Sequence, residues 1–126
     1  DVEDVPEVWN DKYEEYLGIR PDTDSEGCLQ DIHWSHGNFG YFPTYSLGSV
    51  MAAQLFEAAE DDIDDLDGKI AEGEFGDLQD WLGENVHRHG SRYETNELVV
   101  RATGEDFSAD AFLDYVDEKY GELYGI

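Results

Sequence analysis

Residues 27–56 decide how this chain is organised. They read Gly27-Cys28-Leu29-Gln30-Asp31-Ile32-His33-Trp34-Ser35-His36-Gly37-Asn38-Phe39-Gly40-Tyr41-Phe42-Pro43-Thr44-Tyr45-Ser46-Leu47-Gly48-Ser49-Val50-Met51-Ala52-Ala53-Gln54-Leu55-Phe56. The stretch has almost no net charge, whereas Asp and Glu crowd the rest of the chain. We expect this neutral, aromatic and glycine-punctuated stretch to hold the buried chemistry. The remainder has the composition of helical scaffold and solvated surface.

The charge of the chain is its most unusual bulk property. Thirty-two acidic residues stand against seven basic ones, for a formal net charge of −25 over 126 residues. A disordered acidic chain would lack aromatic residues, but 40% of this chain is hydrophobic and 13% is aromatic. A folded protein adapted to molar salt fits better, because such proteins tolerate a strong self-repulsion. Without a basic patch to meet phosphates, nucleic-acid binding is not expected.

Length and cysteine usage bound the organisation further. A chain of 126 residues suits one core, so we expect a single helical region over residues 1–126. One cysteine excludes an internal disulfide and suits a reducing cytoplasm. No apolar run approaches the roughly 18 residues of a membrane span, and no signal peptide opens the chain. Met51 is the only methionine, which fits either amino-terminal processing or a piece of a longer protein.

Apolar spacing predicts an all-α fold, with no convincing strand and no internal repeat. Pro6 suits a first helical turn and Gly18 a helix end, so the first helix spans residues 5–17. The second, apolar nearly all round, runs from Tyr45 to about Ala59 and must be buried or have a partner. A third helix is expected around Ile63–Ile70, ending at Gly73, and a fourth around Leu78–Val86, ending near Gly90. A fifth is expected from Thr95 to Ala102 and a sixth after Ser108, with Thr95 and Ser108 as N-caps.

Four histidines raise the question of a metal site. The spacing of His33 with His36, and of His87 with His89, fits no common metal motif, and no His-Glu-x-x-His occurs. We therefore expect no metal ligand in this chain, and interpret His87 and His89 as hydrogen-bonded groups in an aromatic core. A nucleophilic triad around Cys28 is equally unsupported, because triads are assembled in space rather than in sequence.

His33 and Tyr45 form a more specific candidate pair for a functional site. They lie on either side of a glycine-rich bend, with Tyr45 at the entry to the second helix. An imidazole and a phenol can both donate hydrogen bonds, and donors aimed at one point stabilise a developing oxyanion. The spacing alone is also compatible with Tyr45 simply starting a core helix.

A family resemblance enters at these residues. Residues 27–34 match every specified position of the G-x-x-Q-D-x-H-W motif of the carboxypeptidase Taq family of zinc metallocarboxypeptidases. Residues 35–48 also resemble that family, as do the segments Pro6-Glu7-Val8-Trp9-Asn10, Tyr16-Leu17-Gly18, His87-Arg88-His89-Gly90 and Glu118-Lys119-Tyr120-Gly121-Glu122-Leu123-Tyr124-Gly125. The resemblance therefore covers essentially the whole chain.

The resemblance implies a carboxyl-terminal part of a long, almost entirely helical peptidase. Its members hydrolyse the last peptide bond of peptides with Zn²⁺, held by His-Glu-x-x-His and a third, Glu ligand upstream of this region. Those ligands are not in this chain, so no cofactor is expected in the fragment, which should be inactive by itself. Expected partners are the carboxyl terminus of a peptide and the rest of the parent polypeptide, with a homodimer as a further candidate because members are commonly dimeric.

The resemblance also assigns roles to residues. By similarity to the related thimet oligopeptidase family, His33 would hold a substrate carbonyl or the oxyanion, and Tyr45 would donate its phenol proton toward that oxyanion. Tyr41 is the reserve for Tyr45. Gln30 and Asp31 either position His33 or bind the peptide backbone. Trp34, His36 and Tyr41 complete the expected substrate contacts.

Two functional interpretations remain. The acidic excess is similar to what a halophilic, cytoplasmic version of the enzyme would carry. The alternative is a stand-alone acidic helical module that acts through protein contacts without catalysis. An upstream reading frame that encodes His-Glu-x-x-His in phase would exclude this alternative.

Overall fold

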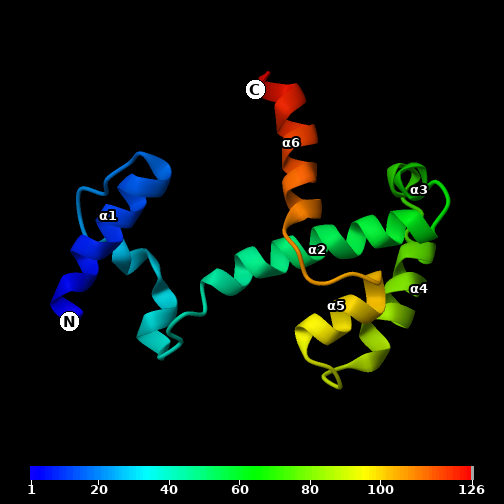
Figure 1. Ribbon diagram of the computed structural model, residues 1–126, viewed down its shortest axis with the longest axis horizontal. Helices are drawn as coiled ribbons and strands as arrows, with labels where there is room; N and C mark the ends of the chain where they lie inside the picture. Colours follow the sequence, from blue (N-terminus) through cyan, green and yellow to red (C-terminus); the bar gives the residue numbers. More distant parts are fainter. Residues whose placement is uncertain (126) are drawn as a thin grey trace. The chain divides into compact units, whose positions relative to one another are not determined.

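The computed structural model describes residues 1–125, and within them the chain is all-α with no strand, as predicted. Two compact units follow one another along the chain, Asp1–Thr44 and Tyr45–Ile126 (Figure 1). Whether both belong to one helical region of a larger enzyme stays a prediction. No helix in residues 1–125 combines the length and the apolar character that crossing a membrane requires.

The first unit is built on one α-helix. A 3-10 turn, η1 (Val2–Asp4), leads into α1 (Val5–Leu17). Pro6 lies in the first turn of α1, where its missing N–H costs nothing. Gly18, with φ of 68°, ends the helix in the left-handed conformation that favours glycine. The predicted helix over residues 5–17 is therefore confirmed at both ends.

The remaining elements of the first unit are short 3-10 turns. They are η2 (Cys28–Gln30) and η3 (Ile32–His36). The loop before them is fastened to α1 by Arg20, whose guanidinium contacts three carboxylates of that helix. The distances are 2.8 Å to Asp11, 3.1 Å to Glu14 and 2.7 Å to Glu7. The predicted loop over residues 19–27 thus takes a defined path back to η2.

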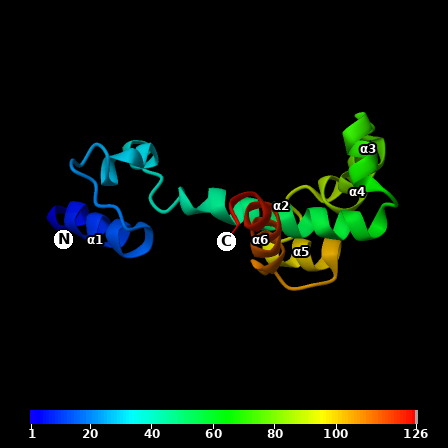
Figure 2. The ribbon, with the colours of Figure 1, turned by 90° about the horizontal axis from the view of Figure 1, so that it is seen from above.

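The second unit consists of five α-helices and one 3-10 turn. These elements are α2 (Pro43–Asp62), whose first two residues close the first unit, α3 (Leu66–Glu72), α4 (Gly76–Asn85), η4 (His87–His89), α5 (Thr95–Thr103) and α6 (Asp110–Tyr124). Figures 1 and 2 both show α3 and α4 at the carboxyl-terminal end of α2. The long second helix is therefore the spine of this unit.

The core of the second unit lies at that end of α2. Ala59, Leu66 and Trp81 are buried together, and partly buried apolar side chains surround them: Leu55, Phe56, Ala58, Ile63, Ile70, Leu78, Leu82 and Ala102. The indole Nε1 of Trp81 donates to Asp62 at 2.8 Å, so the buried polar atom of this large side chain is satisfied. The core joins α2 to α3, α4 and the end of α5.

A buried polar side chain also joins α2 to the segment between α5 and α6. Gln54 of α2 is buried, and its amide nitrogen donates to the carbonyl of Asp106 at 2.9 Å. Its amide oxygen accepts the N–H of Ser108 at 3.3 Å. Both halves of the amide are therefore used to hold the α5–α6 connection to α2.

Several helix starts differ from the predictions by one to three residues, and the largest shift is that of α3, which begins at Leu66 rather than near Ile63. The second helix begins at Pro43 rather than Tyr45, because proline fits a first helical position. Glu94, not Thr95, is the N-cap of α5. The last helix begins at Asp110 after the N-cap Ala109, although the Ser108 hydroxyl does accept the N–H of Asp110 at 3.0 Å.

Burial is where the sequence-based expectation fails most clearly. The neutral stretch was expected to be buried, but Leu29, Ile32 and Phe39 are 64–75% exposed. The first half of α2 is also open, since Tyr45 and Leu47 are more than half exposed. In a unit with a single α-helix, short 3-10 turns cannot cover their apolar side chains on all sides. Within the stretch, only Gly27, Cys28, Asp31 and Gln54 are buried.

Candidate functional site

The site is organised by Asp31, at the junction of the two 3-10 turns. Asp31 is the N-cap of η3, and its carboxylate accepts the backbone N–H of His33 at 3.1 Å. The turn ends at Gly37, which has φ of 77° and donates its N–H back to the turn. A short, capped turn therefore places the His33 side chain on the same side as the carboxylate that precedes it.

The same carboxylate holds the imidazole ring. Nδ1 of His33 lies 2.8 Å from Oδ1 of Asp31, and the two side chains are only 17% and 5% exposed. An ionised carboxylate can only accept, so the ring must carry a proton on Nδ1. The other ring nitrogen, Nε2, then offers a lone pair in the neutral ring and an N–H in the imidazolium. Asp31 thereby fixes both the orientation and the tautomer of His33.

Two aromatic rings lie beside His33. The Tyr41 ring lies 5.0 Å from the imidazole, centre to centre, in a tilted arrangement. The Phe42 ring meets it edge-on at 5.4 Å. Phe42 was not predicted as a site residue, and its place directly after Tyr41 in the sequence is the signal that could have indicated it. The first unit thus brings Asp31, His33, Tyr41 and Phe42 together.

The other predicted residues of the motif point elsewhere. Gln30 is exposed, and its side-chain amide donates to the carbonyl of Ser25, in the loop that precedes η2. His36 is exposed at the end of η3. Of the two roles that the sequence left open for Gln30 and Asp31, the contact that positions His33 is made by Asp31.

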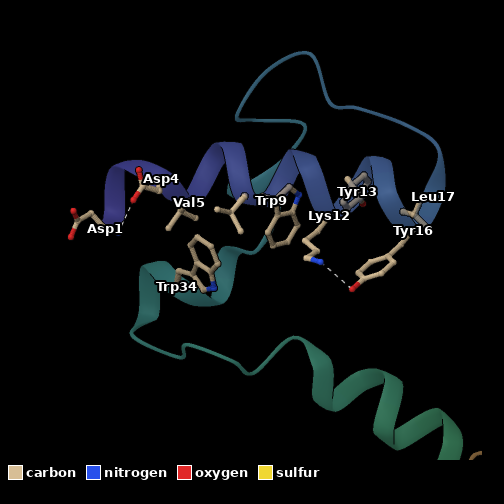
Figure 3. A pocket seen from close by; sticks show the side chains of 10 residues that line it. Asp1, Asp4, Val5, Trp9, Lys12, Tyr13, Tyr16, Leu17 and Trp34 are labelled. Carbon is tan, nitrogen blue, oxygen red and sulfur yellow. Dashed lines mark hydrogen bonds and ion pairs between the residues drawn. The ribbon is translucent and has the colours of Figure 1, made fainter.

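Trp34 lies in an aromatic row rather than beside His33. It meets Trp9 edge-on at 6.1 Å and stacks on Phe39 at 6.1 Å. Together with α1 it borders an apolar groove of about 750 Å³. Figure 3 shows Trp34 from η3 facing Val5 and Trp9 of α1 across this groove. Its predicted role as a substrate contact stays a prediction.

Tyr45 belongs to the second unit. It lies in the first turn of α2, is 59% exposed, and its carbonyl accepts the Ser49 hydroxyl at 3.1 Å. The predicted pairing of Tyr45 with His33 around one substrate oxygen stays a prediction.

The part of the chain that the structure describes offers no group of side chains suited to hold a metal ion. In residues 1–125, no three His, Cys, Asp or Glu side chains gather closely enough to hold an ion. His89 packs beside Tyr93 at 5.3 Å, while His87 is exposed, so the prediction of a core position for His87 is wrong. A 3-10 helix has three residues per turn, so side chains two positions apart, such as those of His87 and His89, point to different sides. We therefore assign no catalytic step to a metal ion bound by these residues.

The family follows from a comparison with known proteins. Residues 1–120 match the model of the carboxypeptidase Taq (M32) metallopeptidase family. The chain belongs to this family. It is 47% identical to Carboxypeptidase 1 of Bacillus subtilis over 98% of its length, and 51% identical to Thermostable carboxypeptidase 1 of Pyrococcus furiosus over 94%.

Solved structures give the same result. An M32 carboxypeptidase from Deinococcus radiodurans R1 is 44% identical and covers 99% of this chain, with a TM-score of 0.91. In each comparison the relative is much longer. The chain spans about a quarter of the length of its curated relatives, 25% of the Bacillus protein and 24% of the Pyrococcus protein. These relatives are carboxypeptidases, and hence hydrolases, of a metallopeptidase family.

Proposed function

We propose that residues 1–126 are the carboxyl-terminal part of a zinc-dependent metallocarboxypeptidase that hydrolyses the last peptide bond of peptides. Membership of the metallopeptidase family supports this proposal, as does the length of the relatives, of which the chain spans a quarter. The metal ligands are assigned to the part of the parent polypeptide outside this chain. The acidic excess supports a halophilic origin, and we propose a cytoplasmic location for the parent enzyme.

The contact between Asp31 and His33 is the observation that carries the catalytic part of the proposal. When water attacks the scissile carbonyl, negative charge develops on the carbonyl oxygen. With Nδ1 held by Asp31, His33 would meet that oxygen through the N–H on Nε2 of its imidazolium form, the form that makes an ion pair with the carboxylate. Because the ring is held in place beforehand, little reorganisation is needed at the moment of reaction.

Tyr45 would supply the second donor through its phenol, with Tyr41 as the reserve. The ring of Tyr41 lies 5.0 Å from that of His33 and belongs to the same unit. Gln30, Trp34 and His36 are proposed as substrate contacts, with Gln30 acting through its amide oxygen because the amide nitrogen is bound to Ser25. The proposed partners are the carboxyl terminus of a peptide and the rest of the parent polypeptide, with a homodimer as a further candidate.

A direct experiment tests whether this chain is a part or a whole. The 126-residue chain and the longer parent polypeptide are each dissolved in molar KCl with zinc or cobalt. Bound metal is measured, together with release of the terminal residue from a blocked dipeptide. We expect neither metal nor turnover for the chain alone, and both for the parent.

The two other outcomes are equally informative. Turnover by the chain alone would mean that its four histidines form a site of their own, and the proposed division of labour would be wrong. A gene that encodes the chain alone, with its own start codon, would instead support the alternative function, a stand-alone acidic helical protein-interaction module without catalytic activity.

A further inference from the structure

A groove runs between α2 and α6 of the second unit. The side of α2 that borders it carries Ser49, Ala52, Ala53, Phe56, Glu57 and Glu60. One face of α6 borders it with Ala111, Phe112, Asp114, Tyr115 and Glu118, and Asp67 of α3 lies at its end. The groove has a volume of about 660 Å³, and Figure 1 shows α6 running away from α2 beyond its first turns. The two helices therefore diverge and leave their facing sides open.

The groove combines an apolar floor with an acidic rim. The small and aromatic lining residues, which we call the floor, are Ala52, Ala53, Phe56, Ala111 and Phe112. The lining carboxylates, which we call the rim, are all exposed: Glu57, Glu60, Asp67, Asp114 and Glu118. Among residues 1–125, no Lys or Arg borders the groove. Lys119, the base next to the rim on α6, donates to the hydroxyl of Tyr115 at 2.5 Å.

The rim charges are close enough to disturb one another. Burial, followed by repulsion from Asp67, Asp61, Glu57 and Glu118, raises the pKa of Glu60. Like charges that face one another across an apolar floor destabilise a surface unless a cation meets them. The groove thus has the complementary chemistry of a segment with an apolar ridge flanked by positive charges.

We propose that this groove is the docking site for a segment of the parent polypeptide outside residues 1–126, one that presents apolar side chains flanked by Lys or Arg. The inference rests on the proposed function, in which the chain is part of a longer enzyme. The length of the relatives supplies the source, because three quarters of each relative lies outside the matched region. Apolar contacts on the floor would supply affinity, and the rim would select a basic segment.

A second copy of the chain is a poor occupant on electrostatic grounds. Each copy carries a formal charge of −25, and two acidic surfaces brought together repel. A basic segment instead neutralises carboxylates that face one another across the floor. The charge of the rim therefore argues for an occupant of different composition.

Coverage of the groove is tested first. Ser49 borders the groove and is exposed, so the S49C variant introduces a thiol there, while the native Cys28 is buried. Maleimide labelling of residue 49 is followed by mass spectrometry in the isolated chain and in the parent enzyme, with each unfolded protein as the reference for full reactivity. We expect rapid labelling in the chain and at least tenfold slower labelling in the parent. Equal rates would overturn the proposal.

The charge of the occupant is tested by a rim variant that should change Tm in opposite directions in the isolated chain and in the parent enzyme. The double variant E57Q/E118Q removes two rim charges. In the isolated chain it should raise Tm by about 1–4 °C, because repulsion is relieved. In the parent it should lower Tm by a similar amount, because Lys or Arg of the docked segment loses its partners. The measurement is thermal unfolding at the lowest salt at which both proteins fold.

A matched control separates this effect from the general relief of charge. Glu72 and Glu74 are exposed and lie outside the groove, so E72Q/E74Q should change Tm in the same direction in both proteins. A rise for the rim variant in the parent as well would overturn the basic occupant. Labelling of residue 49 that depends on protein concentration would assign the groove to a second copy instead. Because neither readout uses turnover, an inactive parent would refute the proposed function and leave this result standing.

Discussion

The two units of this chain hold their important side chains by different means. In the first, Asp31, Tyr41 and Phe42 are near neighbours of His33 in the sequence, and each of them contacts its ring. In the second, the buried apolar residues Ala59, Leu66 and Trp81 come from three helices. The difference shows that the candidate site is set up by local contacts, whereas the helical scaffold depends on contacts between distant segments.

This contrast also separates the two proposed catalytic residues. His33 is oriented by a buried carboxylate and bordered by two rings, whereas Tyr45 is largely exposed in the first turn of a helix. A donor that is held in place beforehand needs little reorganisation in the transition state. We therefore expect the role of His33 to depend on its contact with Asp31, and the second unit to depend on the core around Ala59, Leu66 and Trp81.

The largest effect should come from breaking the core of the second unit. Trp81→Ala removes a buried indole and its hydrogen bond to Asp62. We expect it to lower the free energy of unfolding by about 3–5 kcal/mol, measured by urea unfolding followed by circular dichroism in molar KCl. Trp34→Ala, at a half-buried position in the first unit, is the matched control and should cost clearly less. Equal losses would contradict the contrast between the units.

Loss of the His33 donor should have the next largest effect, on activity rather than stability. In the parent enzyme, His33→Gln should lower kcat by about 10²–10³, the usual cost of removing one oxyanion donor, with a smaller change in KM. The exposed His87 of η4 provides the control, and His87→Gln should leave both parameters unchanged. A His33 variant with raised KM and normal kcat would make this residue a binding contact only.

Asp31 should act through His33, with a smaller effect. Asp31→Asn keeps the size of the side chain but replaces the carboxylate that accepts from Nδ1 with a neutral amide. A lost hydrogen bond to a charged group corresponds to about 1.5–3 kcal/mol, or about 10- to 100-fold in kcat.

The readout that distinguishes this positioning role is spectroscopic. Nitrogen-15 NMR of the isolated chain, at a pH at which the ring is neutral, should show the His33 proton on Nδ1 in the native protein. In Asp31→Asn it should show a mixture of the two tautomers. An unchanged tautomer in the variant would mean that the 2.8 Å contact does not determine the state of the ring.

The fold could be predicted from the sequence where the signals are local. Pro6 and Gly18 bracket α1, and both act through their own backbone, so the bounds of that helix were predicted correctly. The start of α2 was placed two residues late, because the apolar pattern begins at Tyr45 but the helix begins at Pro43. Burial could not be predicted, since the exposure of Leu29 or Phe39 depends on which other segments are available to cover it.

The candidate site shows the same division. The motif identified His33 and Asp31, but only the geometry shows that the carboxylate of Asp31, rather than the amide of Gln30, contacts the ring. The acidic groove between α2 and α6 could not be predicted either. Its residues come from three helices, and nothing in the sequence indicates that their faces meet.

The smallest expected effect tests the polar contacts that fasten the first unit. Arg20 contacts Asp11, Glu14 and Glu7, and the hydrogen bond to Asp11 is the main cause that raises the pKa of its guanidinium above the ordinary value. A raised pKa stabilises the folded chain at every pH below the pKa of this group in the unfolded chain, and that stability is lost only as the pH rises through the folded value. Since Arg20 is then charged in both states, its contribution should not vary between neutral and mildly alkaline pH.

Salt, not pH, should therefore modulate this contribution. Arg20→Gln should lower Tm at the lowest salt at which the chain folds, and leave it unchanged in molar KCl, because exposed ion pairs are screened there. Arg88→Gln removes the same charge from an exposed arginine whose one ion pair within residues 1–125 is with Glu84. It therefore controls for the change in net charge and should have the smaller effect at low salt. If both variants lose the same stability, the three contacts of Arg20 add nothing beyond its charge, and the first unit is held mainly by its buried carboxylate and aromatic contacts.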